Sequence, residues 1–433
     1  MKPTGLLVGA ALLAVLGAGI WWSNRKQAAA KTDTATKILS IPADGVEEVR
    51  LKNPQQTIDL KRENGKWRMT QPEALPADPD ATTTLVSAIS SLNADTVVEE
   101  KATDLTPYGL KTPTAEVHVI EKGGKTDDLL IGDETLKADG NYVKLANDPR
   151  VFTIATYVKN NIEKAPNDLR DKRLMTFDSD KLTRVSLGPT GKPEIEFGKN
   201  AQNEWQILKP RPMRADGGTV DSLVSNLKDV RMDLAEEPDK AASAFGSGTK
   251  IATAAVTDAG GNQTLEVRKN KDNYYAKSSG VAGVYKVSND FGKAVEKPLN
   301  DFRNKKLFEF GFSDPSKIEL KGASYVKSGD KWMSGAKTMD NTSVQNLIDK
   351  LRDLTATTFD EKGGLEPVLE ATVTSNMGKR VEHVTISKQG NQYFAKREDE
   401  PSIYGLDGKA VEDLQKAAAD VKEAAPPAPA KKK

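Results

Sequence analysis

The 433-residue sequence contains no cysteine. The chain therefore cannot form disulfides, use a thiol as a nucleophile or bind a metal through sulfur ligands. Histidine is scarce as well, since only His118 and His383 occur. Each lies in a run in which apolar and polar residues alternate, so we expect both side chains at solvent-facing positions of comparable strands.

Neither sign of charge is in excess, because 63 basic residues stand against 62 acidic ones. Nucleic-acid binding depends on concentrated positive charge, so this balance argues against a nucleic-acid partner. The sequence also lacks the His-Glu-x-x-His, P-loop, Gly-x-Ser-x-Gly and calcium-loop patterns. We therefore predict no catalytic residues, no cofactor-binding residues and no metal ligands, and we do not expect an enzyme.

Three imperfect copies of one unit fill most of the chain. Each copy has a tryptophan (Trp67, Trp205 or Trp332) in a short alternating segment that follows turn-forming residues, as in the second arm of a hairpin. A run with helical spacing follows each tryptophan, and an aspartate stands at each expected N-cap. The apolar positions of these runs are Leu85, Val86, Ile89 and Leu92; Val220, Leu223, Val224, Leu227 and Val230; and Val344, Leu347, Ile348, Leu351 and Leu354, and the caps are Asp78, Asp216 and Asp340.

The later part of each copy is rich in β-forming residues and ends in a short helical pattern. The pentapeptide Gly292–Glu296 recurs letter for letter as Gly408–Glu412. Each copy has the size of a small domain with its own core. We therefore predict an α+β protein with three tandem repeat domains, each a mainly antiparallel sheet with packed helices, at residues 41–173, 174–306 and 307–421.

The segment Asn167–Leu174 reappears as Asn300–Leu307 between consecutive copies. It could be a basic recognition loop for an anionic partner, or it could link one domain to the next. The segment is missing after the third copy, where a link is not needed. We therefore favour the structural interpretation.

Two acidic clusters, Asp127-Asp128 and Asp78-Pro79-Asp80, could bind a cation or form a carboxylate pair. They have no counterpart in the other copies, so exposed acidic turns are the favoured interpretation. The tryptophans could likewise form a carbohydrate platform, but one tryptophan in each hairpin more often lies in the core under a helix.

The first 23 residues are predicted to be a transmembrane anchor. Residues 4–22 carry no charge and would span about 28 Å as a helix, enough for a hydrocarbon core. A cleaved signal peptide with Ala28–Ala30 as its site is the alternative, which Arg25 and Lys26 disfavour. Residues 24–40 are predicted to be a flexible linker and residues 422–433 a disordered Pro/Ala/Lys tail.

The orientation of the anchor has two interpretations. Arg25, Lys26, Lys31 and Lys37 follow the apolar run, which by the positive-inside rule places the body in the cytoplasm. A very short N-terminal tail before a single span more often stays inside while the long domain is exported. We expect a single-pass protein of the inner (cytoplasmic) membrane with an extracytoplasmic, periplasmic body.

The order of several short motifs resembles a bacterial family known as domain of unknown function DUF4340. These motifs are Trp67 before Pro72, the Pro107–Pro113 turn, Ile131-Gly132 before Tyr142, and Leu169–Leu174. The resemblance implies a membrane-anchored envelope protein, often encoded beside ABC-type transporter components, and it implies no reaction.

The leading hypothesis is a scaffold or accessory protein without enzymatic activity, partnered by the membrane and by ABC-type transporter subunits. The alternative is a module that binds envelope polysaccharide or peptidoglycan through exposed aromatics, namely Tyr274, Tyr275, Tyr393 and Phe394. A hydrolase with an unrecognised site is the least favoured hypothesis.

Overall fold

The structure, a computed structural model, describes residues 36–311, 314–320, 322–360, 363 and 366–425. The chain divides between Lys172 and Arg173 into two compact units. The predicted anchor at residues 1–23 lies outside the described residues. Among the helices of these described ranges, none combines the length and the apolar character of a membrane span.

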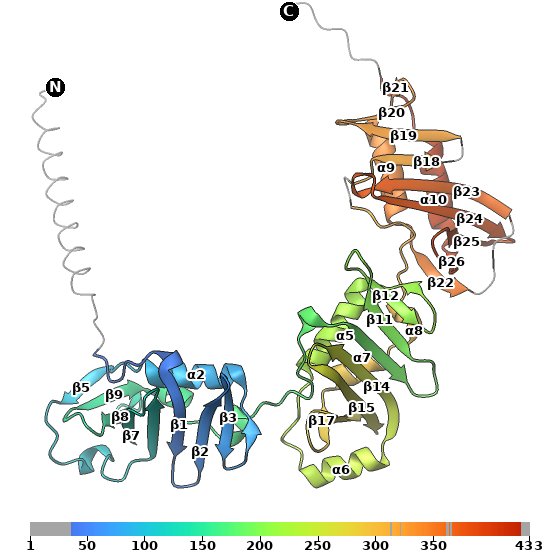
Figure 1. Cartoon of the computed structure of the whole chain (residues 1–433). Coiled ribbons are helices and arrows are strands. Elements are labelled where there is room, and N and C mark those ends of the chain that lie inside the picture. Colours follow the sequence, from blue (N-terminus) through green and yellow to red (C-terminus); the bar gives the residue numbers. More distant parts are fainter. Residues whose placement is uncertain (1–35, 312–313, 321, 361–362, 364–365, 426–433) are drawn as a thin grey trace, which may run out of the picture. The chain divides into compact units, whose positions relative to one another are not determined.

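Three sheets make up the fold, and the described strands pair only in antiparallel fashion, as predicted (Figure 1). The strand orders are β4-β3-β2-β1-β6-β7-β8-β9-β5, β13-β12-β11-β10-β14-β15-β16-β17 and β21-β20-β19-β18-β23-β24-β25-β26-β22. The first sheet belongs to the first unit, and the other two belong to the second unit. We refer to residues 36–172, 173–305 and 306–425 as repeats 1, 2 and 3. The predicted domain boundaries inside the second unit stay predictions.

Repeat 1 begins with a four-stranded meander, continues through one helix and closes with strands and two short helices. Its elements are η1 (Ala43–Gly45), β1 (Val46–Lys52), β2 (Thr57–Glu63), β3 (Lys66–Gln71), β4 (Leu75–Pro76), α2 (Pro79–Ser90), β5 (Thr96–Glu99), η2 (Thr106–Tyr108), β6 (Ala115–Glu121), β7 (Thr126–Glu134), β8 (Gly140–Leu145), β9 (Val151–Ala155), α3 (Thr156–Ile162) and α4 (Pro166–Leu169). The β2–β3 hairpin turns at Asn64 and Gly65, both with positive φ, as the hairpin prediction required.

Repeat 2 follows the same order and adds helix α6. Its elements are η3 (Ser179–Lys181), β10 (Arg184–Pro189), β11 (Ile195–Lys199), β12 (Trp205–Lys209), β13 (Met213–Arg214), α5 (Gly217–Asp229), α6 (Pro238–Ser247), β14 (Thr249–Asp258), β15 (Gly261–Asn270), β16 (Asn273–Ser278), β17 (Tyr285–Val287), α7 (Asn289–Val295) and α8 (Leu299–Phe302). An isolated bridge between Asp233 and Lys286 stands where repeat 1 has the β5–β9 pairing.

Repeat 3 ends differently, in one longer helix instead of two short ones. Its elements are β18 (Lys317–Leu320), β19 (Ala323–Ser328), β20 (Lys331–Ser334), β21 (Lys337–Thr338), α9 (Asn341–Arg352), β22 (Ala356–Asp360), β23 (Glu366–Ser375), η4 (Asn376–Gly378), β24 (Arg380–Gln389), β25 (Gln392–Arg397), β26 (Ile403–Leu406) and α10 (Gly408–Ala419). The repeated pentapeptide therefore occupies different helical positions, since Gly292 lies within α7 whereas Gly408 begins α10.

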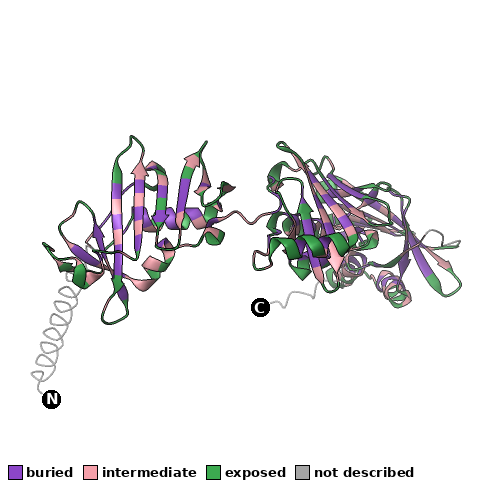
Figure 2. Cartoon of the chain, turned by 90° about the horizontal axis from the view of Figure 1, so that it is seen from below, coloured by how far each residue is buried: buried purple, intermediate pink, exposed green. Residues whose placement is uncertain are grey.

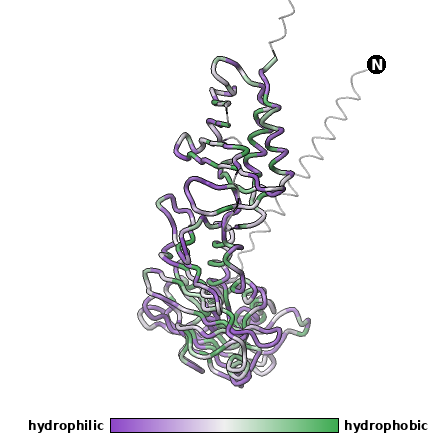
Figure 3. Tube along the Cα trace, turned by 90° about the vertical axis from the view of Figure 1, so that its right-hand side faces the viewer, coloured by the Kyte–Doolittle hydropathy of each residue, from purple (hydrophilic) through white to green (hydrophobic). Residues whose placement is uncertain are grey.

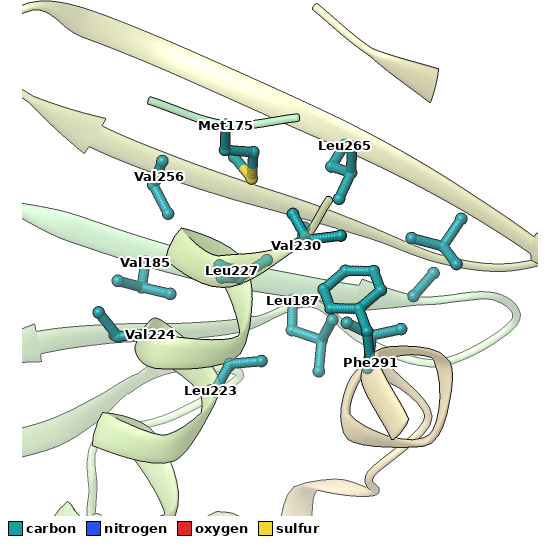
Figure 4. Close-up of a cluster of buried hydrophobic side chains, with 14 of the residues drawn as sticks. Met175, Val185, Leu187, Leu223, Val224, Leu227, Val230, Val256, Leu265 and Phe291 are labelled. Carbon is teal, nitrogen blue, oxygen red and sulfur yellow. The ribbon is translucent and has the colours of Figure 1, made fainter. Parts of the chain in front are cut away.

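Each sheet packs its apolar face against the helix that follows the tryptophan hairpin. Buried and exposed residues alternate along the strands (Figure 2), and short hydrophobic and hydrophilic stretches alternate along the trace of the described residues (Figure 3). In repeat 2 the predicted stripe of α5 points into the sheet, where it meets Val185, Leu187 and Val256 (Figure 4). Equivalent clusters fill repeats 1 and 3. Three separate main cores result, two of them within the second unit.

The aspartates predicted as N-caps hold that position in all three repeats. The Asp216 Oδ1 accepts the Thr219 N–H at 2.8 Å, and the Asp340 Oδ1 accepts the Ser343 N–H at 2.8 Å. Asp78 caps α2 in the same way. These bonds satisfy donors that a helix cannot satisfy internally, which fixes where each helix begins.

We expect Asp216→Ala to lower the free energy of unfolding by about 1 kcal/mol, because the first turn of α5 loses its cap. Asp216→Asn keeps an oxygen acceptor and should restore most of the loss. Urea unfolding of both variants measures the difference. Equal stability of the alanine variant and the parent chain would contradict the assigned cap.

The segments between the copies are built into the fold. The Leu169 carbonyl accepts the Asp78 N–H at 2.7 Å, and the Phe302 carbonyl accepts the Asp216 N–H at 2.8 Å. A few residues later the chain starts the next repeat, since the Leu174 N–H donates to Val230 at 3.0 Å. Each segment therefore closes one repeat and opens the next, as the structural interpretation predicted.

Backbone hydrogen bonds of the same kind occur at both ends of the described chain. They show that two predictions were wrong. The Ala94 N–H donates to Thr36 at 2.8 Å, and Ile38 and Leu39 are buried, so residues 36–40 belong to repeat 1 and are not part of a flexible linker. The Asp340 N–H donates to Lys422 at 2.8 Å, so residues 422–425 are not part of a disordered tail. Backbone hydrogen bonds, which the side-chain composition does not reveal, order both segments.

Candidate functional site

The acidic clusters considered as cation sites are structural in the described residues. Asp78 caps a helix. Asp127 and Asp128 lie in strand β7, so the interpretation as an exposed turn is wrong for them, and the buried Asp127 accepts a hydrogen bond from Lys125 Nζ at 2.9 Å. Asp128 lies 2.5 Å from the Nδ1 of His118. Across the described ranges, no group of three metal-ligating side chains comes together.

Both histidines lie on the outer side of a sheet, as predicted, but not in comparable strands. His118 is in β6, the strand paired with β1, whereas His383 is in β24, one strand further from the centre of its sheet. His383 Nδ1 lies 2.8 Å from the Thr372 hydroxyl. Their similar sequence surroundings reflect the strand period and not an equivalent position in the repeat.

The tryptophans belong to the cores. Trp205 and Trp332 are 8% and 5% exposed, and Trp67 is half-buried against the first core. The Trp205 Nε1 donates to Asp221 Oδ1 at 2.7 Å, which satisfies the one polar atom that the indole takes into the interior.

The aromatics proposed as a polysaccharide platform are buried, and that expectation is wrong. Tyr274, Tyr275, Tyr393 and Phe394 are between 2% and 9% exposed. Tyr274 and Tyr275 are neighbours in β16. Tyr274 faces the main core of repeat 2, and Tyr275 lies on the opposite face of the strand, where it packs against Phe245 of α6. Both faces of this strand are covered, so its aromatic side chains cannot stack on a sugar.

Where the chain passes from repeat 2 to repeat 3, buried charges come together that the sequence reading did not single out. Arg214, at the end of β13, lies 3.7 Å from Glu400, and their side chains are 13% and 6% exposed. Burial lowers the pKa of the Arg214 guanidinium, with repulsion from Arg397 adding to the effect. Burial also raises the pKa of the Glu400 carboxyl despite the nearby arginine. For each of the two groups, the loss of hydration on burial therefore outweighs the stabilisation that the opposite charge provides.

A second buried pair lies beside the first, inside repeat 3. Arg397 and Glu382 are 3.1 Å apart with side chains 3% and 4% exposed. Burial acts to lower the pKa of Arg397, but hydrogen bonds and charge from Asp399 and Glu382 outweigh it and the pKa is raised. Arg397 also donates to the Leu307 carbonyl, and Glu382 accepts the Glu309 N–H at 2.9 Å. The pair thereby fixes the first residues of repeat 3.

Two further arginines connect the repeats at this place. Arg303 is buried, donates to the Ser402 hydroxyl at 2.9 Å and lies 3.6 Å from the centre of the Phe359 ring. Arg380 pairs with Glu204 of repeat 2. We call Arg214, Arg303, Arg380, Arg397, Glu204, Glu382 and Glu400 the junction cluster.

A cleft of about 400 Å³ opens beside the junction cluster. Trp205, Asp221 and Arg214 form part of its lining, together with Asn304 from the linking segment and Glu309 from the start of repeat 3. Most of these groups already have partners: Asp221 binds the indole, and Asn304 donates to Glu309. The arrangement is suited to holding two repeats together, although the Nε and Nη1 atoms of Arg214 and the Oε1 atom of Glu400 are buried without a hydrogen-bond partner.

A scan against family models matches the family described as domain of unknown function DUF4340 over residues 67–212 and 205–368. The two matches begin at Trp67 and Trp205, the tryptophans of the first two repeats. Each match therefore runs across a linking segment into the following repeat. No curated protein matches the chain, and neither does any solved structure.

Proposed function

The chain belongs to the DUF4340 family, and on this premise we propose that it is a membrane-anchored scaffold or accessory protein without enzymatic activity. The uncharged residues 4–22 would hold it in the cytoplasmic membrane, with the repeats on the extracytoplasmic side. Its partner would be the membrane subunits of an ABC-type transport complex.

The observation that supports this proposal is the junction cluster. Two repeats with separate cores lie in one compact unit, and three arginines of the cluster, Arg214, Arg303 and Arg380, contact the other repeat. Opposite charges that face each other across the contact favour one arrangement, since any other separates a buried charge from its partner. A scaffold needs such a fixed arrangement between its modules.

Purification of the full chain from its native membranes tests the proposal. We expect a tagged chain, extracted in mild detergent, to bring ABC-type membrane subunits with it in constant proportion. A matched variant that lacks residues 4–22 should lose both membrane attachment and these partners. Recovery of the full chain as a lone monomer would contradict the proposal.

A further inference from the structure

Two large apolar side chains of repeat 1 stand out in solvent. Leu136, in the loop between β7 and β8, is 100% exposed, and Tyr157, in the first turn of α3, is 70% exposed. The two positions are joined by the backbone, because the Thr156 N–H donates to Asp139 at 3.2 Å and Gly140 pairs with Ala155. Leu136 and Tyr157 thus mark one edge of repeat 1, which we call the 136/157 edge.

The described chain begins next to this edge. The Thr36 carbonyl accepts the Ala94 N–H at 2.8 Å, and the neighbouring Asp95 N–H donates to Thr153 at 2.8 Å. Thr153 is in β9, whose last residue is the Ala155 that pairs with Gly140. The 35 residues that precede Thr36, including the uncharged residues 4–22, therefore join the body within a few residues of the 136/157 edge.

Met377 and Val381 of repeat 3 are also exposed, but at the two positions of the 136/157 edge an exposed apolar side chain occurs only in repeat 1. In repeats 2 and 3 the corresponding hairpins close with two-residue turns, between Asn270 and Asn273 and between Gln389 and Gln392. In repeat 1 the last pairing is Glu134 with Asn141, so the loop is longer and carries Leu136 at its tip.

The position of Tyr157 shows the same contrast. Tyr157 is the second residue after the N-cap of its helix, Ala155. The second residues after the N-caps of α7 and α10 are Asp290 and Lys409, both exposed and charged. An aromatic side chain at this exposed position occurs only in the repeat that adjoins the apolar N-terminal sequence.

We propose that the 136/157 edge lies on the surface of the lipid bilayer, an inference that rests on the proposed membrane anchoring. Leu136 would enter the boundary between headgroups and acyl chains, where one leucine at a loop tip gains from leaving water. Tyr157 has the apolar ring and polar hydroxyl that suit the interface, and the exposed Lys137 can reach lipid phosphates. Repeat 1 then contacts the membrane surface in one fixed orientation, in addition to its connection through the anchor.

The absence of cysteine makes a direct test possible, because one introduced cysteine can carry an environment-sensitive fluorophore. The full chain is labelled as Leu136→Cys or Tyr157→Cys and reconstituted into vesicles of phosphatidylethanolamine and phosphatidylglycerol. Matched controls are Lys271→Cys in the β15–β16 turn and Asp290→Cys in α7. A lipid with a nitroxide near the acyl-chain carbonyl serves as the quencher.

We expect blue-shifted emission and the loss of about half the signal at positions 136 and 157, with little change at 271 and 290. If the chain floats with the vesicles but all four positions respond alike, the inference is overturned and the anchoring stands. If the chain does not float with the vesicles, the proposed function fails and the inference fails with it.

Discussion

Replacing Phe302 by alanine is expected to lower the free energy of unfolding of the second unit by about 3–5 kcal/mol. Phe302 is fully buried, its ring centre lies 5.0 Å from that of Phe197, and its carbonyl accepts the Asp216 N–H. Alanine leaves a cavity between the linking segment and the sheet of repeat 2. Urea unfolding of the full chain measures the loss.

Lys305→Ala is the matched control, because Lys305 lies in the same segment and is exposed. It should change stability by less than about 0.5 kcal/mol. The two variants separate the interpretations of the segment. A recognition loop would tolerate the loss of Phe302, so an unchanged stability of that variant would contradict the structural role.

Replacing Arg397 by serine is expected to cost about 3–5 kcal/mol, because it leaves the Glu382 carboxylate buried without its partner. Repeat 2 shows how the same position works without charge. Ser278 occupies the place of Arg397 and donates to the Leu174 carbonyl at 2.5 Å, while Gln263 occupies the place of Glu382 and binds the Thr176 N–H at 2.9 Å.

The double variant Arg397→Ser with Glu382→Gln copies that neutral pair into repeat 3. We expect it to be more stable than Arg397→Ser alone by at least about 1 kcal/mol, because no charge is left without a partner. A thermodynamic cycle of both single variants and the double variant, followed by urea unfolding, gives the coupling. Strict additivity would mean that the two side chains do not act as a buried pair.

Much of the fold could be predicted because its signals are local and occur three times. Val220, Leu223, Val224 and Leu227 follow the helical period, and Asp216 stands where the helix needs an acceptor, so both the helix and its start were evident. The tryptophan hairpins could be predicted because turn-forming residues precede each tryptophan at a similar distance. Each pattern would be weak evidence in a single copy, but its occurrence in three copies made the prediction stronger.

The burial of the tyrosines could not be predicted in this way. A strand with one solvated face shows alternation, but Tyr274 and Tyr275 are consecutive and both buried. Helix α6, which is particular to repeat 2, covers the second face, and in repeat 3 Gly363 lies against Phe394. The residues that cover this second face come from segments distant in the sequence, so the local sequence pattern of the strand does not predict the burial.

The sequence contains one indication of the junction cluster. Glu382 stands two residues before Val384 and four before Ile386, so it lies on the buried face of β24. A carboxylate at such a position requires a partner. Nothing in the sequence names that partner, because Arg397 and the linking segment meet it only after the repeat has folded.

Hydrogen exchange of the two linking segments tests most directly the claim that they are parts of the folded repeats. The amides of Asp171 and Leu174, and those of Asn304 and Leu307, donate to backbone carbonyls at 2.9–3.1 Å. We predict that these amides exchange as slowly as those of the neighbouring strands. Exchange at the rate of an open loop, while the strands stay protected, would contradict the account.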